Sequence, residues 1–243
     1  MAPIRTSGLE VAVVRCPVRV SILQGAVSMF GRISLVVYVT LLTGCMSTAT
    51  LKLDDEKSSS LHEKSLVVTT SDKPDFAAMT AGNMVVPVVG AVMMISEGNE
   101  IIRKHDVDDP AAFIGQEIAE QLAMLRNMKL VPLSVPSSDD DIDYLSATHA
   151  DQDFALDVRT INWSFGYFPS DWDNYRVIYS VKARLIDLHK EEVIAEAFCA
   201  RVPEQSSTSP SYQQLVGYHA AGLKRELQVA AEHCVKELSG KLL

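Results

Sequence analysis

The sequence predicts an α+β protein, in which helices pack on a mixed sheet and a long helix closes the chain. Three observations support this fold class: helical spacing of apolar residues before residue 130, alternation of apolar and polar residues between 154 and 201, and renewed helical spacing over 211–242. The chain has 243 residues, of which 47% are hydrophobic and 22% are charged. This balance is typical of a globular protein and argues against a disordered chain, a collagen or a coiled coil.

A short apolar run near the start of the chain is typical of a signal peptide. Residues 33–42 carry no charge and follow Arg32. These ten residues are too few to span a bilayer but suit the core of a signal peptide. The run ends in Leu42-Thr43-Gly44-Cys45, which resembles the lipobox of bacterial lipoproteins. The resemblance implies cleavage before Cys45 and attachment of a lipid to the Cys45 thiol.

Met29 is the simplest start for this signal. Residues 29–44 then form a compact signal peptide, whereas a signal that included residues 1–28 would be unusually long. We therefore expect residues 1–28 to be an over-extended gene start. The alternative is a genuine N-terminal extension, helical over about residues 10–20.

A lipid on Cys45 would determine where the protein resides, because two or more acyl chains anchor a protein stably. The following residue is Met46 rather than aspartate, which in lipoproteins of double-membraned bacteria favours the outer membrane. We expect an outer-membrane protein that faces the periplasm. Residues 45–64 are rich in Ser, Thr, Lys, Asp and Glu, which predicts a flexible tether. Residues 65–243 then form a single domain.

The domain begins with a strand and two helical regions. Residues 66–70 are apolar and β-branched, which predicts a strand, and residues 76–104 look helical in part. Asp109-Pro110 is a good helix start, with the aspartate as the N-cap, and apolar residues recur at helical spacing over 110–127. A short strand over 129–133 and an acidic loop follow.

The second half of the domain predicts strands followed by a helix. Apolar and polar residues alternate over 154–160 and 175–185, and residues 193–201 form a third run. A polar connection of only four residues predicts a hairpin between the last two runs. An apolar stripe then predicts a helix over 211–242.

This order of elements resembles that of periplasmic lipoproteins related to the TolB amino-terminal domain. The group includes the penicillin-binding-protein activators and the curli-secretion pore lipoprotein. The similarity covers about residues 65–240. It lies in the order of elements and in the sequence segments Val181-Lys182-Ala183-Arg184-Leu185-Ile186-Asp187 and Val193-Ile194-Ala195-Glu196. The resemblance implies a related fold and transfers no functional residue.

Two cysteines remain in the predicted domain, and an oxidising envelope favours their pairing. Cys199 lies in a predicted strand and Cys234 on the apolar face of the last helix, so a disulfide would join this helix to the sheet. The alternative is two separate buried thiols. Nothing in the nearby sequence activates either thiol for catalysis.

A charge-free stretch of 21 residues runs over 76–96. Its length alone would suggest a membrane helix, but Pro87 and several polar residues interrupt it. Gly82, Gly90 and Gly98 recur every eight residues and would lie along one side of a helix, where backbones can approach closely. Three interpretations stay open: a helix buried in the domain, a helix that packs on a partner or another copy, and partial insertion into lipid.

Aromatic residues gather between 163 and 179 and include a candidate partner surface. Gly166, Pro169 and Asp171 predict a loop or an excursion from a strand end. Aromatic side chains on such a loop suit contacts with a protein, a glycan or a membrane interface. The alternative is that they cap the open edge of the core. The candidate residues are Trp163, Phe165, Tyr167, Phe168 and Trp172.

Charge and motifs argue against several function classes. A net charge of -9 and a pI near 5.1, without a basic cluster, argue against a nucleic-acid partner. The acidic groups at 106–109 and 139–143 lack EF-hand spacing, and the six dispersed histidines indicate no zinc site. Phosphate-binding loops and nucleophile elbows are missing from the sequence. We expect a protein without catalytic residues, metal or cofactor.

The sequence therefore predicts a periplasm-facing lipoprotein that binds or scaffolds another component of the cell envelope. The lipid would confine it to one surface and raise its effective concentration against partners there. The alternative is a self-assembling pore or export-apparatus lipoprotein, in which residues 76–104 form the inter-subunit or membrane element.

Overall fold

The computed structural model describes residues 50–80, 87–131 and 141–243. All described residues belong to one compact unit, Met46–Leu243. The expected over-extended gene start over residues 1–28, the predicted signal peptide and the lipobox with Cys45 lie outside the described residues.

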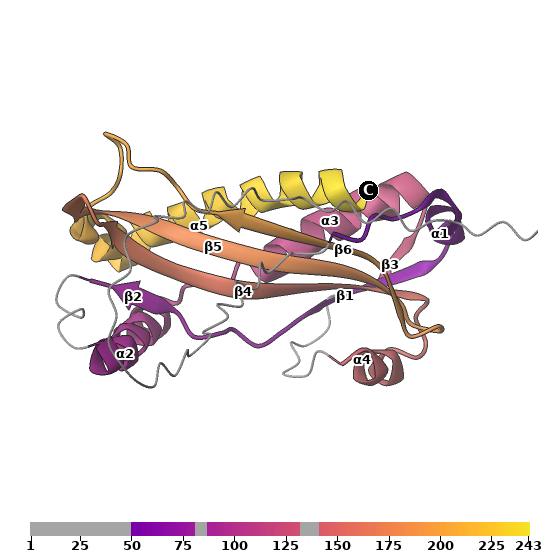
Figure 1. Cartoon of the computed structure of the whole chain (residues 1–243). Helices are drawn as coiled ribbons and strands as arrows, with labels where there is room; N and C mark the ends of the chain where they lie inside the picture. Colours follow the sequence, from indigo (N-terminus) through magenta and orange to yellow (C-terminus); the bar gives the residue numbers. More distant parts are fainter. Residues whose placement is uncertain (1–49, 81–86, 132–140) are drawn as a thin grey trace, which may run out of the picture. The chain divides into compact units, whose positions relative to one another are not determined.

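A six-stranded sheet forms the centre of this unit (Figure 1). Its main path runs β3-β1-β4-β5-β6, and β2 pairs with β4 outside that path. β1 is parallel to β3 and β4, β2 is parallel to β4, and β5 is antiparallel to β4 and β6, which confirms the predicted α+β class with a mixed sheet. The strands are β1 (Ser65–Thr70), β2 (Ala77–Met79), β3 (Lys129–Val131), β4 (Phe154–Phe168), β5 (Asp171–Asp187) and β6 (Glu192–Arg201).

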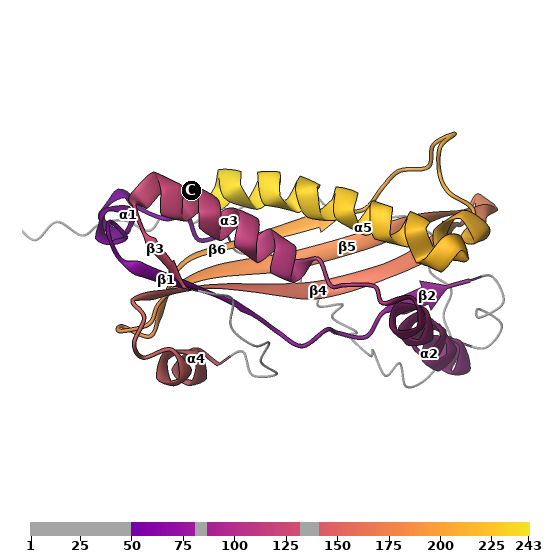
Figure 2. The ribbon, with the colours of Figure 1, turned by 180° about the vertical axis from the view of Figure 1, so that it is seen from behind.

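Two long helices lie side by side on one face of the sheet (Figure 2). α3 spans Ala111–Arg126 and α5 spans Tyr212–Leu242, and each places buried apolar side chains against the strands. Gly115 brings α3 close to the sheet, because a Cβ there would lie 2.8 Å from a Val68 methyl. The predicted amphipathic helix over 110–127 is thus confirmed, with Pro110 rather than Asp109 at the N-cap position.

Three shorter or peripheral helices complete the unit. α2 (Pro87–His105) packs beside β2 at one end of the sheet. α4 (Ile142–Thr148) packs Leu145 against the sheet face opposite α3 and α5. α1 spans Asp55–Ser60 and precedes β1.

The long C-terminal helix is confirmed, with one interruption near its start. Ser211 caps the N-terminus of α5 through its side chain. Residues 217–220 leave the helical conformation, and three of them have positive φ. Gly222 accommodates this break, because a Cβ there would lie only 2.0 Å from the Gln214 carbonyl oxygen.

The predicted disulfide joins Cys199 of β6 to Cys234 of α5, with the two Cα atoms 5.6 Å apart. Both cysteines are fully buried in the main hydrophobic core. The bridge therefore links the edge strand of the sheet to the helix that covers it.

The flexible tether predicted over residues 45–64 differs from the structure in its second half. Asp54 caps α1 by accepting a hydrogen bond from the Lys57 amide at 2.7 Å. Leu61 is fully buried in the core, and Leu51 pairs with Glu196 of β6 through two backbone hydrogen bonds of 2.9 Å. The isolated leucines of this segment have partners on distant elements, so the folded unit begins well before residue 65.

Candidate functional site

The aromatic segment predicted as an exposed excursion is part of two long strands. β4 continues to Phe168 and β5 begins at Asp171, so only Pro169 and Ser170 separate the paired strands. Alternation along β4 directs Trp163 and Phe165 toward the face that the helices cover. Both side chains are fully buried, and Phe168 is buried as well. These three residues are therefore corrected from partner surface to core, in line with the alternative interpretation that they close the core.

Contacts of the buried rings explain their position. The Phe76 and Trp163 rings meet edge to face with centroids 5.1 Å apart, and Trp163 donates its indole hydrogen bond to the Pro74 carbonyl at 2.8 Å. Phe165 contacts the rings of Tyr175 and Tyr212. These aromatic residues join β4, β5 and the start of α5 into one cluster.

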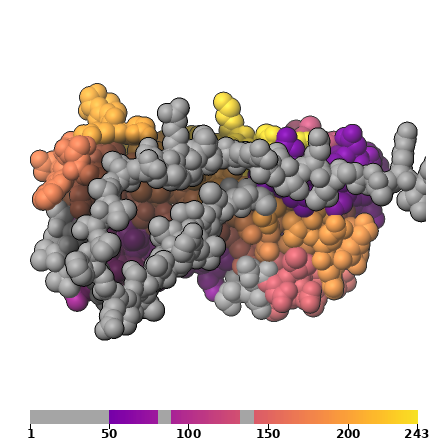
Figure 3. Space-filling model, in the orientation of Figure 1, coloured from indigo at the N-terminus to yellow at the C-terminus, as the bar shows by residue number. Residues whose placement is uncertain are grey.

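Trp172 is the one candidate of the five that lies largely outside the core. It is 64% exposed and lies against the half-buried Tyr167, with ring centroids 6.0 Å apart. Figure 3 shows that the β4–β5 turn, which precedes Trp172, reaches the surface at one end of the unit. The predicted partner surface is thus reduced to Trp172 and the edge of Tyr167.

A groove of about 460 Å³ lies beside Trp172, and we call it the Trp172 groove. Gly166 forms part of its floor, and Met79 of β2 packs over that glycine. If residue 166 carried a Cβ, that atom would lie 3.4 Å from the Met79 side chain. The register of β2 on β4 places Met79 directly opposite Gly166. The groove is lined by Met79, Ser164, Phe165, Gly166, Tyr167, Pro169, Trp172, Arg176 and Ile178.

Arg176 supplies the charge of this groove. Its guanidinium lies 5.3 Å from the centroid of the Phe168 ring and donates a hydrogen bond of 3.4 Å to the Pro203 carbonyl. The described lining residues include no carboxylate, histidine or cysteine. The arrangement suits the binding of an apolar or aromatic group, with Arg176 at its margin.

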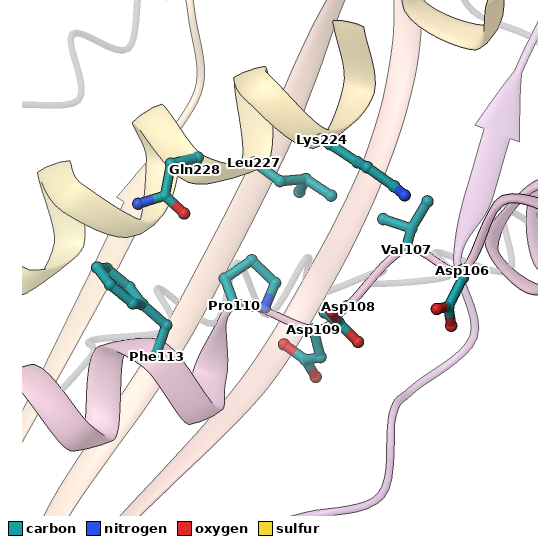
Figure 4. A pocket seen from close by; sticks show the side chains of 9 residues that line it. All are labelled: Asp106, Val107, Asp108, Asp109, Pro110, Phe113, Lys224, Leu227 and Gln228. Carbon is teal, nitrogen blue, oxygen red and sulfur yellow. The ribbon is translucent and has the colours of Figure 1, made fainter. Parts of the chain in front are cut away.

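A second pocket, of about 300 Å³, lies between the α2–α3 turn and α5 (Figure 4). Figure 4 shows Lys224, Leu227 and Gln228 on α5 facing the turn that carries Asp106 and Asp109. Within the acidic group at residues 106–109, Asp108 is solvated, and its side chain is 92% exposed. Asp109 differs, because it points into the protein.

Asp109 belongs to a buried hydrogen-bond network that the sequence did not indicate. Its Oδ1 atom accepts hydrogen bonds from the Ala111 amide at 2.9 Å and from the Thr160 hydroxyl at 2.5 Å. The Thr160 hydroxyl also bonds the Tyr179 hydroxyl at 2.9 Å. Burial raises the pKa of Asp109, and the hydrogen bonds from Thr160 and Ala111 oppose the shift. The network ties the start of α3 to β4 and β5.

The described residues contain one group of side chains with potential metal ligands close together, Cys199, His233 and Glu237. The Cys199 sulfur is bonded to Cys234 and is therefore no thiolate ligand. Glu237 pairs with His233 at 3.3 Å and with Lys241 at 2.5 Å. These contacts account for the group without a metal.

The charge-free stretch predicted over residues 76–96 contributes β2 and the first half of α2, and residues 81–86 lie outside the described part. Gly98 packs on the chain itself, since a Cβ there would lie 2.0 Å from the Phe76 carbonyl oxygen. Ile101 and Ile102 are buried on the same side of the helix. The interpretation of a buried helix is therefore correct for this side of α2. Several apolar side chains on its other side are exposed.

No described helix is both long enough and apolar enough to cross a membrane.

No protein-family model and no curated protein matches this chain. Among solved structures, protein CT253 of Chlamydia trachomatis is similar, with 12% identity, a TM-score of 0.35 and coverage of 73% of this chain and 97% of that one. PelC of Paraburkholderia phytofirmans, a dodecamer, has 16% identity, a TM-score of 0.33 and coverage of 75% and 91%. Lipoprotein GNA1162 of Neisseria meningitidis has 14% identity, a TM-score of 0.30 and coverage of 73% and 99%. At these values none of the three assigns an activity, a ligand or a partner to this chain.

Proposed function

We propose that this chain is a cell-envelope lipoprotein, anchored to the outer membrane through Cys45, whose periplasmic domain binds another envelope component without catalysing a reaction. The sequence Leu42-Thr43-Gly44-Cys45, at the end of a charge-free run, supports the anchor. The observation that carries the binding role is the exposed Trp172 beside an apolar groove.

The Trp172 groove is the proposed contact site for a partner protein. Tryptophan and tyrosine dominate the energetics of protein interfaces, because they bury a large area with few rotatable bonds. Trp172 is supported by Tyr167, and Arg176 is held by the Phe168 ring and the Pro203 carbonyl. The groove is thus ordered before a partner arrives, which lowers the entropic cost of binding.

The early start of the folded unit limits how far the domain can lie from the proposed lipid anchor. Leu51 is already paired with β6, so only six residue steps separate it from Cys45. A fully extended chain of this length spans at most about 21 Å. The proposed anchor therefore keeps the domain close to the membrane surface, rather than on the long tether that the sequence predicted.

The anchor is tested by incorporation of a labelled fatty acid in growing cells. Cys45→Ala should abolish the label, whereas the control variant Ser47→Ala should keep it, because Ser47 lies outside the proposed lipobox. Density-gradient fractionation of the labelled protein then tests the outer membrane. An unlabelled parent protein would disprove the anchor.

The binding role is tested by cross-linking in vivo. A photoreactive amino acid replaces Trp172 in the full chain, and in a control it replaces Met124, which is 82% exposed on α3. We expect a specific adduct with one envelope protein from position 172 and none from position 124. Equal or absent adducts at both positions would reject the groove as the contact site. An adduct between two copies would favour the self-assembling alternative instead.

A further inference from the structure

The exposed side of α2 is apolar in its first half. Val89, Val92 and Met93 are 54%, 67% and 50% exposed and share one face of the helix at i, i+3 and i+4 spacing. Ile95 is exposed beside them. The opposite side packs on β2 through Gly98, so the exposed face is the one that the domain leaves uncovered.

Charge is segregated along the axis of α2 rather than around it. Residues 76–96 contain no charged side chain, and the first charge of the helix is Glu97, whose carboxylate accepts a hydrogen bond from the Tyr212 hydroxyl at 3.1 Å. The exposed Glu100 follows, and the last turn then carries the exposed Arg103 and Lys104. A helix whose polarity changes along its axis suits insertion end-on into a bilayer, with its apolar end deeper than its charged end. A helix that lies flat on a membrane surface changes polarity around its axis instead.

The length of the charge-free part of α2 fits one leaflet of a bilayer. The ten helical residues before Glu97 rise about 15 Å, which is half of a hydrocarbon core of about 30 Å. The described helices include none that could span the membrane. The segment is therefore suited to partial insertion.

The neighbourhood of α2 favours lipid over a protein as the occupant of this face. Protein interfaces carry about one hydrogen bond per 100–200 Å². Between Val89 and Ile95 the exposed face offers no side-chain donor or acceptor, and acyl chains need none.

We infer that the N-terminal half of α2 inserts into one leaflet of a lipid bilayer, as a membrane contact separate from the lipid on Cys45. Arg103 and Lys104 then lie toward the phosphate headgroups, where long basic side chains are favoured. Two contacts at different parts of the domain would restrict its orientation on the membrane and would determine which surfaces face the periplasm.

The test places one thiol on α2 of the full-length lipidated protein. Cys199 and Cys234 are bonded to each other, Cys45 is blocked by its lipid in protein that incorporates fatty acid, and Cys16 is replaced by alanine. The thiol introduced by Met93→Cys can then be labelled selectively with an environment-sensitive fluorophore. Met124→Cys is the matched control, because Met124 is a highly exposed methionine on α3. Both proteins are reconstituted into vesicles of phosphatidylethanolamine and phosphatidylglycerol, with or without nitroxide groups on the acyl chains.

We expect the probe at position 93 to emit at shorter wavelength in vesicles and to lose emission when the acyl chains carry nitroxide. The probe at position 124 should instead be quenched by aqueous iodide. Equal quenching of both probes by iodide would overturn the inference. The inference would also be overturned if nitroxide left the emission of the position-93 probe unchanged and probes on neighbouring copies quenched one another. That result would assign this face to a second copy of the chain. Fatty-acid incorporation at Cys45 is measured separately, so each hypothesis can fail without the other.

Discussion

Gly98 of α2 lies so close to Phe76 that an added Cβ would stand 2.0 Å from the Phe76 carbonyl oxygen and 3.0 Å from the Ala78 amide nitrogen. Phe76 is in turn fully buried against Trp163. The backbone of α2 therefore rests directly on the segment that forms β2. This contact holds the apolar first half of α2 at the end of the sheet.

Gly98→Ala should detach or displace α2, because the new methyl group meets backbone atoms that have no freedom to move aside. We expect a loss of about 1–3 kcal/mol in the free energy of unfolding, which is typical of overpacking. The matched control is Gly240→Ala in α5, where nothing lies within 4 Å of the added Cβ. That variant should be neutral or more stable by up to about 1 kcal/mol. Urea denaturation of both variants measures the difference, and equal effects would contradict the close contact.

Replacing both bridged cysteines by alanine should weaken the attachment of α5 to β6. The disulfide closes a loop of 35 residues, for which the chain-entropy model gives about 3–4 kcal/mol. Urea denaturation of the parent protein, with and without a reducing agent, should reproduce most of this loss. The double variant should be insensitive to reductant. A parent protein with equal stability under both conditions would show that the bridge contributes nothing.

The strands and helices with strong local patterns were predictable from the sequence. Alternation along β5 and the stripe of α5 repeat often enough to identify both elements, and they place Cys199 and Cys234 on facing surfaces. β2 was not predictable, because three residues show no period and its pairing with β4 depends on chain that is distant in sequence.

The aromatic segment shows why exposure was harder to predict than secondary structure. Gly166 and Pro169 suggested a loop, but Gly166 instead admits Met79 beside the strand, and Pro169 occupies the short turn. Trp163 and Trp172 each lie between two polar residues. One is buried because Phe76 and the Pro74 carbonyl cover it, and the other is exposed because it follows the turn at the end of the sheet.

Asp153 should make the stability of the protein depend on acid pH. Its carboxylate accepts hydrogen bonds from the Ser65 amide at 2.9 Å, the Ser65 hydroxyl at 2.8 Å and the Lys64 ammonium at 3.2 Å. These bonds, chiefly the one from the Ser65 amide, lower the pKa of Asp153 from 3.8 to about 2. The folded state thus resists protonation more than the unfolded chain does.

The resulting stabilisation should be complete well above pH 3.8 and should be lost as the pH falls toward about 2. Asp153→Asn should reduce the free energy of unfolding by about 1–2 kcal/mol at neutral pH, after allowance for solvent screening. The difference between parent and variant should shrink in acid. Urea denaturation at several pH values between neutrality and acid measures it, and a difference that does not change with pH would contradict the assignment.

Asp109 should tolerate an amide but not the loss of its oxygen. In Asp109→Asn the side-chain oxygen can still accept from the Ala111 amide and the Thr160 hydroxyl. The titrating carboxyl, whose burial raises the pKa of Asp109, is gone. In Asp109→Ala both donors lose their acceptor, which costs about 1–3 kcal/mol.

A raised carboxyl pKa means that the folded state binds a proton more readily than the unfolded chain, so the parent protein loses stability as pH rises through the pKa of Asp109. Asp109→Asn lacks this loss. Its stability relative to the parent should therefore improve as pH rises above about 3.8, the ordinary value for the group. Tyr179→Phe is the matched control for the network, because it removes only the hydroxyl that bonds Thr160 and leaves the Asp109 carboxyl in place. If Asp109→Asn and Asp109→Ala lose equal stability at neutral pH, the oxygen of Asp109 does not hold α3 to the sheet.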